Sequence, residues 1–337
     1  MKKFLKILGR VLAVILAVYL VLAIWPRPTN YPATNPNRTT EDLPILIAHG
    51  GGNREFPDNT LEAFYNAYSV DHRALFETDV SITKDGVVIL SHDTTLDRKT
   101  NVTGNISDWN YADLMAQKVD FGYTNPTKND QLNGDRKKFT TEDGKEVTPL
   151  DVEYPAGVEA RDEAVFLATT LEELMTTFPN NVINVEIKQE GDLGRKCLAE
   201  VLRLVEVYDA WDRVTLASFH EDIQLEFLEL VQTQAVPENF MYSPAYDVAT
   251  EFFVLQLLHL DVFFGHPIAV LQIPMEEYGF DLATTGVTGA AHAHNIAVQY
   301  WTINEPEDMH HLIDIGADGI MTDYPHRLKE VYDSYGK

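Results

Sequence analysis

Short apolar runs alternate along this chain with longer stretches whose apolar residues recur at helical spacing, from residue 44 almost to the end. A short apolar run between turn signals predicts a buried strand, and an apolar repeat every three and four positions predicts a helix. The runs that predict strands are 45–48, 74–80, 87–91, 182–187, 214–218, 240–242, 270–273, 298–303 and 319–322. Strands that alternate with helices are typical of an α/β fold, and we predict a TIM-type (β/α)8 barrel.

These runs exceed the eight strand positions of such a barrel by one. A turn at Lys84-Asp85-Gly86 separates two of them, so residues 74–91 are predicted to form a hairpin. We also expect one of the weaker runs, near 240 or 270, to lie outside the barrel. Residues 119–158 are polar and rich in Asp, Lys, Asn and Gly, which predicts an insertion in a loop.

The first 25 residues have the charge pattern of a membrane segment. Four basic residues, Lys2, Lys3, Lys6 and Arg10, precede an uncharged apolar run over 11–25. No small-x-small cleavage site follows that run, so we predict an uncleaved N-terminal transmembrane helix over 1–25, with a removed signal peptide as the alternative. Because the basic flank stays inside, this prediction implies a single-pass protein of the cell membrane whose main domain is extracytoplasmic.

Two segments follow the anchor. Residues 26–44 contain five prolines with polar neighbours, which predicts an extended spacer that holds the main domain just above the lipid. Residues 45–330 show no internal repeat. Since a chain of 337 residues with 45% hydrophobic content can bury one large core, we assign 45–330 to a single barrel domain.

The composition is strongly acidic. There are 52 acidic and 26 basic residues, and the formal net charge of −26 becomes −30 when the four basic residues of the anchor are set aside. Such a surface argues against nucleic acid as a partner, and it repels an anionic substrate unless a bound divalent cation reverses the local sign. The single cysteine, Cys197, excludes an intramolecular disulfide framework and a cysteine-based zinc site.

Ionisable side chains lie in or directly after four of the predicted strands, and the active sites of β/α barrels assemble at strand ends. They are His49, Glu77, Asp79, His92, Glu186 and Lys188. Glu77 and Asp79 are two residues apart and leave the same face of their strand, where a divalent cation removes the cost of holding like charges together. One cation, two histidines and a lysine are the groups that metal-assisted phosphodiester cleavage requires.

Eight landmarks follow one another along the chain: Ile47-Ala48-His49-Gly50-Gly51, Pro57-Asp58-Asn59-Thr60-Leu61, 77–86, Ser91-His92-Asp93, Glu186-Ile187-Lys188, Ser218-Phe219, Trp301-Thr302-Ile303-Asn304, and 319–325. At these places the chain resembles the glycerophosphodiester phosphodiesterase family. The resemblance implies a TIM barrel that hydrolyses glycerophosphodiesters to glycerol phosphate and an alcohol. It implies that Glu77, Asp79 and Glu186 bind one divalent cation, Ca²⁺ or Mg²⁺. It further implies that His49 and His92 are the general acid and base, and that Lys188 contacts the phosphate.

The sequence departs from the family pattern at two places. The family usually has His-Arg-Gly where this chain has His49-Gly50-Gly51, so an arginine that helps to hold the phosphate is absent from its usual position. Arg54, five residues after His49, is our candidate for a replacement substrate contact, and a solvated loop arginine is the alternative. Asp58 stands where the family usually has glutamate, which keeps the carboxylate.

Two other functions remain open from the sequence. A lysophospholipase D or phosphoinositide-type lipase would use the same barrel on lipids of the membrane that holds it. A catalytically weak binding protein would keep the barrel without the activity. The sequence leaves open which histidine is acid and which is base, and whether the attacking hydroxyl belongs to water or to the substrate's own glycerol.

Overall fold

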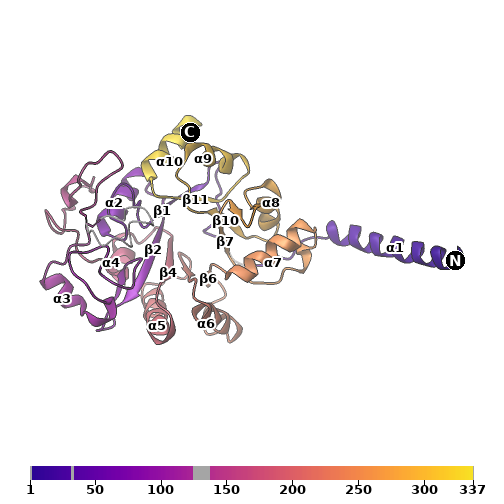
Figure 1. The fold of residues 1–337 in the computed structure, drawn as a ribbon, viewed down its shortest axis with the longest axis horizontal. Helices are drawn as coiled ribbons and strands as arrows, with labels where there is room; N and C mark the ends of the chain where they lie inside the picture. The colour runs from indigo at the N-terminus through magenta and orange to yellow at the C-terminus, as the bar shows by residue number, and fades with distance from the viewer. Residues whose placement is uncertain (1, 32–33, 124–136, 337) are drawn as a thin grey trace.

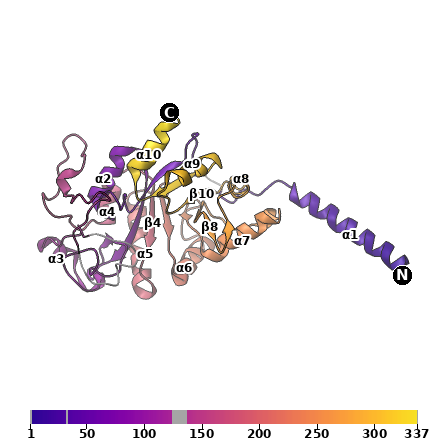
Figure 2. The ribbon, with the colours of Figure 1, turned by 45° about the horizontal axis from the view of Figure 1, so that its top comes forward.

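The computed structural model describes residues 2–31, 34–123 and 137–336. Helix α1 (Lys2–Ala23) extends away from a body formed by the other elements, and it leaves that body beside α7 and α8 (Figure 1 and Figure 2). Among the described residues, α1 is the one helix long and apolar enough to cross a membrane, and its window over Lys3–Ala23 is not buried. An N-terminal signal sequence has the same length and composition.

Eight parallel strands form the body in the order β6-β5-β4-β2-β1-β11-β10-β7. Their bounds are β1 (Ile45–His49), β2 (Leu75–Ile82), β4 (Ile183–Ile187), β5 (Val214–Ala217), β6 (Met241–Tyr242), β7 (Val270–Ile273), β10 (Ala297–Tyr300) and β11 (Gly319–Thr322). Each pairs in parallel with its neighbours in this order, whereas β6 and β7 at the two ends do not pair among the described residues. The predicted (β/α)8 barrel is therefore confirmed, in a nearly closed form.

The ninth strand is β3 (Val88–Leu90), which pairs antiparallel with β2 and confirms the predicted hairpin. The prediction that a run near 240 or 270 lies outside the barrel is wrong, because β6 and β7 both belong to the sheet. The β6 strand has only two residues, and an apolar run this short does not distinguish a barrel strand from a loop. A small hairpin of β8 (Glu276–Glu277) and β9 (Phe280–Asp281) follows β7.

Helices surround the barrel on its outside (Figure 1). They are α2 (Leu61–Val70), α4 (Leu171–Thr177), α5 (Gly191–Val207), α6 (Glu221–Gln232), α7 (Tyr246–Leu257), α8 (Thr285–Ala293), α9 (Pro306–Asp314) and α10 (Pro325–Ser334). The short α3 (Tyr111–Ala116) and the 3-10 turns η1 (Ile106–Asp108), η3 (Pro149–Asp151) and η4 (Asp261–Phe263) lie in connections. Helix α2 begins after Thr60, whose side chain accepts a hydrogen bond from the amide of Ala63.

Side chains alternate between the two faces of the barrel strands. Ile47, Leu75 and Met321 form a cluster inside the barrel, whereas Leu46 and Phe76 belong to the larger core that includes the surrounding helices. Positions two and four residues after an inward-facing side chain point inward as well. The alternation therefore aims the ionisable side chains near the carboxyl ends of β1, β2 and β4 into the mouth of the barrel.

Part of the 26–44 segment, which the composition predicts to be an extended spacer, packs into the opposite end of the barrel. Asn37 is fully buried, donates to Oγ1 of Thr215 (3.0 Å) and accepts from Nε2 of Gln299 (3.1 Å). Asn35 donates to the carbonyl of Ala269 (2.6 Å). These asparagines give the segment the composition of a linker. In the structure they form hydrogen bonds with buried polar groups of the barrel strands. Residues 32–33 lie outside the described residues.

The predicted insertion over 119–158 belongs to a longer connection between β3 and α4. Phe121 and Val152 from this stretch pack in a second apolar cluster with Ile89 and Phe166. Residues 124–136 of the predicted insertion lie outside the described residues. The described part is thus joined to the barrel by its own small core.

Candidate active site

The strand register places the predicted acidic residues side by side. In the parallel pairing of β1 with β2, His49 is the partner of Glu77, and in the pairing of β2 with β4, Asp79 is the partner of Glu186. All four side chains leave the inward face of their strands, where His49 is the last residue of β1 and Glu186 the last but one of β4. The two-residue spacing of Glu77 and Asp79 places both on one face of β2. The strand register makes them neighbours of His49 and Glu186.

Glu77, Asp79 and Glu186 each offer a carboxylate oxygen within 4.8 Å of the others. The amide of Gly50 donates to Oε2 of Glu77 (2.9 Å). Burial and the charge of Asp79 raise the pKa of Glu77 to about 8, and the same two causes raise the pKa of Glu186. The raised pKa values show that the carboxylate charges of the cluster are not fully balanced by neighbouring groups. Carboxylate oxygens are the ligands that Ca²⁺ and Mg²⁺ prefer.

Lys188 lies against the same carboxylates. Its Nζ atom donates to Oε1 of Glu186 (2.7 Å) and is 3.2 Å from Oδ1 of Asp79. Burial opposes the charged form of Lys188, but Asp79 and Glu186 outweigh it and hold the pKa of the ammonium above its usual range. A positive charge therefore lies at the edge of the acidic cluster.

His49 is oriented by a second carboxylate. Its Nδ1 atom donates to Oδ1 of Asp323 (2.6 Å), and its Nε2 atom is 4.0 Å from Oε2 of Glu77. Asp323 in turn accepts a hydrogen bond from the side chain of Asn304 (2.8 Å). Burial lowers the pKa of His49, but the hydrogen bond to Asp323 and the charges of Glu77 and Asp323 raise it to about 10.

His92 has a similar partner, contributed by its own loop. Its Nδ1 atom donates to Oδ1 of Asp93 (3.0 Å), and Arg98 binds both oxygens of Asp93 (2.7 and 2.6 Å). The hydrogen bond to Asp93 raises the pKa of His92, with a further contribution from the charge of Asp79. His92 therefore lies close enough to the acidic cluster for the charge of Asp79 to influence its pKa.

Arg54 lies on the His49 side of the site. Its Nε atom is 4.0 Å from Oδ2 of Asp323, and its side chain is 39% exposed. A separation of 4.0 Å is too long for a hydrogen bond. The guanidinium is thus close to the partner of His49, and it is not held rigidly there.

Three groups with roles in this geometry were not among the predicted site residues. Asn59 donates to Oδ2 of Asp79 (2.9 Å) and to Oδ2 of Asp58 (3.2 Å), and its own Oδ1 accepts from the amide of Asp79 (3.0 Å). Lys99 forms a buried ion pair with Asp58. Asp323 orients His49. Asp323 could have been found by its position directly after β11, by the rule that identified His49.

Exposed aromatic side chains surround part of the barrel mouth. Phe219, in the connection that follows β5, is 76% exposed, and its ring lies 6.2 Å from that of Trp301, which directly follows β10. Tyr246 at the start of α7 contacts Tyr278 of the β8–β9 hairpin, with ring centroids 6.2 Å apart. This side of the mouth is apolar, whereas the side formed by β1, β2 and β4 is charged.

Comparisons with known proteins agree with this geometry. A family model described as "Glycerophosphoryl diester phosphodiesterase family" matches residues 49–327. A lysophospholipase D of Rattus norvegicus is 28% identical over 89% of this chain and 90% of its own length, and a glycerophosphodiester phosphodiesterase of Bacillus altitudinis is 26% identical over 85% and 97%. The structure of an Oleispira antarctica phosphodiesterase in complex with the product sn-glycerol-3-phosphate superposes with a TM-score of 0.58 at 21% identity, covering 86% of this chain and 97% of that one. At this identity the superposition supports the fold.

Proposed function

The chain belongs to the glycerophosphoryl diester phosphodiesterase family, and on that premise we propose that it hydrolyses glycerophosphodiesters to glycerol phosphate and an alcohol with one divalent cation held by Glu77, Asp79 and Glu186. The observation that carries this proposal is the meeting of three carboxylates, two histidines and a lysine at one end of the barrel. Each lies in a strand of the sheet or in the loop that directly follows one.

A cation held by Glu77, Asp79 and Glu186 would supply positive charge that attracts the phosphodiester oxygens and offsets the charge developing on phosphorus. Lys188 holds another phosphate oxygen. One of His49 and His92 removes a proton from the attacking hydroxyl, and the other donates a proton to the leaving alkoxide. Asp323 and Asp93 each hold the Nδ1 atom of their histidine, so Nε2 is the atom of each ring that is left to exchange the proton.

The test measures release of glycerol phosphate from glycerophosphocholine. Chelator should abolish the activity and added Ca²⁺ or Mg²⁺ should restore it, and Glu186→Gln should raise the cation concentration required. Glu190→Gln is the matched control, because Glu190 follows the same strand and its side chain is 78% exposed. Full activity in chelator would contradict the metal proposal. Cation binding without turnover of any phosphodiester would favour the binding protein.

A lysophospholipase D activity is the second candidate. The exposed Phe219–Trp301 pair at the mouth supports it, because aromatic side chains there can contact an acyl chain that soluble glycerophosphodiesters lack. Phe219→Ala should then lower turnover of lysophosphatidylcholine and leave turnover of glycerophosphocholine unchanged. Equal effects on both substrates would count against this activity, and a phosphoinositide-type lipase would be revealed by turnover of phosphoinositides instead.

We further propose that α1 is an uncleaved anchor in the cell membrane, with the barrel outside. Its apolar length and the basic residues near its start support this topology. Protease added to intact cells should then digest the barrel and leave the N-terminus protected. Recovery of the protein from the soluble extracellular fraction, trimmed near residues 26–33, would instead identify a cleaved signal peptide.

A further inference from the structure

An apolar surface, formed by Val254, Leu257 and Leu258 at the end of α7 together with Phe263 of η4, lies exposed beside the base of α1. We call these four residues the α7 face; they are 46%, 56%, 50% and 61% exposed, respectively. Val254, Leu257 and Leu258 recur at helical spacing, so they point to the same side. Exposed apolar groups gathered in this way mark a contact surface more often than a solvated one.

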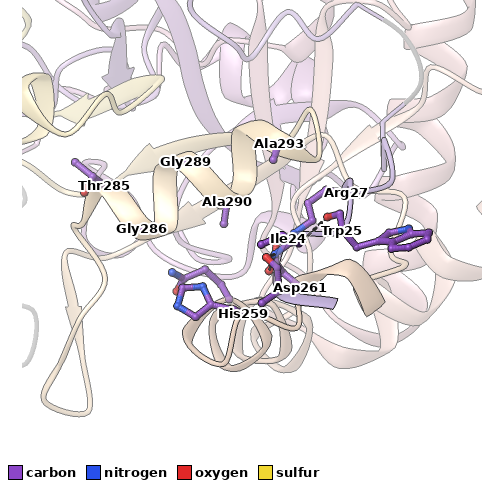
Figure 3. Close-up of a pocket in the computed structure, with 12 residues that line it drawn as sticks. Ile24, Trp25, Arg27, His259, Asp261, Thr285, Gly286, Gly289, Ala290 and Ala293 are labelled. Carbon is purple, nitrogen blue, oxygen red and sulfur yellow. Dashed lines mark hydrogen bonds and ion pairs between the residues drawn. The ribbon is translucent and has the colours of Figure 1, made fainter. Parts of the chain in front are cut away.

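The base of α1 is attached directly to η4. The guanidinium of Arg27 binds both oxygens of Asp261 (2.7 and 2.8 Å) and also donates to the carbonyls of Leu22 (3.3 Å) and Ala23 (3.2 Å) in the last turn of α1. Figure 3 shows Arg27 and Asp261 together in the pocket between α1 and the barrel, with Trp25 close by. One side chain therefore joins the end of α1 to η4, which carries Phe263 of the α7 face.

Buried contacts continue this attachment into the barrel. Asp261 lies 3.2 Å from Nε2 of His294, whose Nδ1 is 2.6 Å from Oδ1 of Asn30. Asn30 donates to the carbonyl of Phe264 (3.1 Å). Because these groups are buried and mutually paired, rotation of α1 relative to the barrel would break several hydrogen bonds at once.

A contact further along α1 indicates the depth of the α7 face. The hydroxyl of Tyr19 donates to the carbonyl of Leu258 (3.1 Å). Tyr19 precedes Ala23, the last residue of α1, by four positions, which corresponds to about 6 Å along the helix axis. If α1 spans a bilayer, the end of α7 lies level with its last turn, within the roughly 5–10 Å depth that interfacial helices occupy.

The charge of this surface favours apolar insertion over electrostatic attraction. The stretch from Tyr246 to Gly265 contains Asp247, Glu251 and Asp261 and neither lysine nor arginine. It cannot be drawn to anionic lipid, and burial of its apolar side chains is the available driving force.

We propose that the α7 face lies in the interfacial layer of the bilayer that α1 spans, and that the barrel is held on the membrane in one orientation. This rests on the proposed anchor. The β8–β9 hairpin packs against α7, with the rings of Phe253 and Phe280 5.8 Å apart, so α7 connects the docked surface to the aromatic side of the mouth.

The test uses the full chain in phosphatidylcholine nanodiscs that contain quencher-labelled lipid. The only native cysteine is buried, so single introduced cysteines can carry an environment-sensitive fluorophore. Val254→Cys and Phe263→Cys report the α7 face, and Val14→Cys reports α1. Val207→Cys and Leu225→Cys are the controls, because these residues are 58% and 57% exposed and lie on α5 and α6.

We expect strong quenching at 14, 254 and 263, weak quenching at 207 and 225, and little change with added salt. If position 14 is quenched but positions 254 and 263 are quenched no more than the controls, the docking is overturned and the anchor stands. Absence of quenching at 14 would overturn both. Arg27→Gln provides a second test: it should lower quenching at 254 and 263 and leave quenching at 14 unchanged, and equal quenching in this variant would show that Arg27 does not set the orientation.

Discussion

The ammonium group of Lys99 contacts the carboxylate of Asp58 in an almost completely buried ion pair, with the two side chains 5% and 7% exposed. Asp58 also accepts a hydrogen bond from Asn59, which donates to Asp79 of the acidic cluster. The charge of Lys99 outweighs the burial of Asp58 and keeps the pKa of its carboxyl well below the usual range. The Asp58 side chain of this pair lies beside Gly50, the position where the family usually has arginine: a Cβ atom added at Gly50 would be 2.9 Å from Cβ of Asp58.

The first prediction concerns this pair. Lys99→Met leaves the Asp58 carboxylate buried without its partner and should lower the free energy of unfolding by about 3–5 kcal/mol. Lys99→Met combined with Asp58→Asn should recover most of that loss, since the amide can still accept from Asn59. Denaturant unfolding of the two variants and the parent measures the difference. A double variant as unstable as Lys99→Met would mean that packing of the lysine stem matters more than its charge.

The second prediction concerns the residue between this pair and the cluster. Asn59 has a positive φ of 60°, which glycine adopts freely, so Asn59→Gly removes the side chain without backbone strain. Asp79 would lose the donor that orients it, and cation affinity should fall by about 10- to 100-fold, the usual cost of losing such a partner of a metal ligand. Calorimetric titration with Ca²⁺ and Mg²⁺ measures it. Unchanged affinity would show that the strand alone orients Asp79.

The strand ends could be predicted from the sequence because alternation within a strand depends only on residue spacing. Glu77 and Asp79 are therefore predicted to share one face, whereas the place of Glu186 beside them rests on the resemblance to the family. The contacts of Asn37 could not be predicted, because its partners Thr215 and Gln299 are far away in sequence and its neighbours have the composition of a linker. Lys99 was missed for a related reason: a lysine in a polar loop is ordinarily solvated, and only the fold shows that it is buried.

The third prediction is a proton released when the cation binds. Burial and the charge of Asp79 raise the pKa of Glu77 to about 8 in the absence of a cation, so at pH 7 its carboxyl group is mostly protonated. A cation requires the carboxylate, so binding at pH 7 should release about one proton, and affinity should fall as the pH is lowered further. Calorimetry in two buffers of different ionisation enthalpy counts the protons. Release should fade well above pH 8 and disappear in Glu77→Gln, and binding without release at pH 7 would contradict the assignment.

The fourth prediction concerns Arg54. Because its guanidinium is not held by Asp323, it can turn toward the substrate phosphate at little cost. Arg54→Ala should lower kcat/KM by about 10- to 100-fold, equivalent to roughly 1.4–2.7 kcal/mol for one charge-assisted contact. Arg54→Lys should recover only part of this, since an ammonium lacks the planar fork. Wild-type kcat/KM in Arg54→Ala would leave Lys188 as the phosphate contact and end the replacement hypothesis.

The fifth prediction assigns the two histidines. Asp323 raises the pKa of His49, and Asp93 raises the pKa of His92, in each case through a hydrogen bond to Nδ1. Asparagine in place of either aspartate removes the charge, so the pKa of the attached histidine should fall. A general base is active when deprotonated and determines the acidic limb of the pH profile of kcat/KM, whereas a general acid determines the basic limb. Replacing the aspartate bonded to the base should therefore extend activity to lower pH on the acidic limb. Replacing the aspartate bonded to the acid should make the basic limb fall at a lower pH than in the parent.

Asp323→Asn and Asp93→Asn are controls for each other, because each leaves the other histidine and the three carboxylates of the cluster intact. We expect one variant to move the acidic limb and the other to move the basic limb, both toward lower pH, and the limb that moves identifies the role of the histidine concerned. Lower activity with unmoved limbs in both variants would mean that the aspartates only orient the rings. Movement of the same limb in both would show that the histidines do not divide the roles of acid and base between them, and the proposed mechanism would then be wrong at that step.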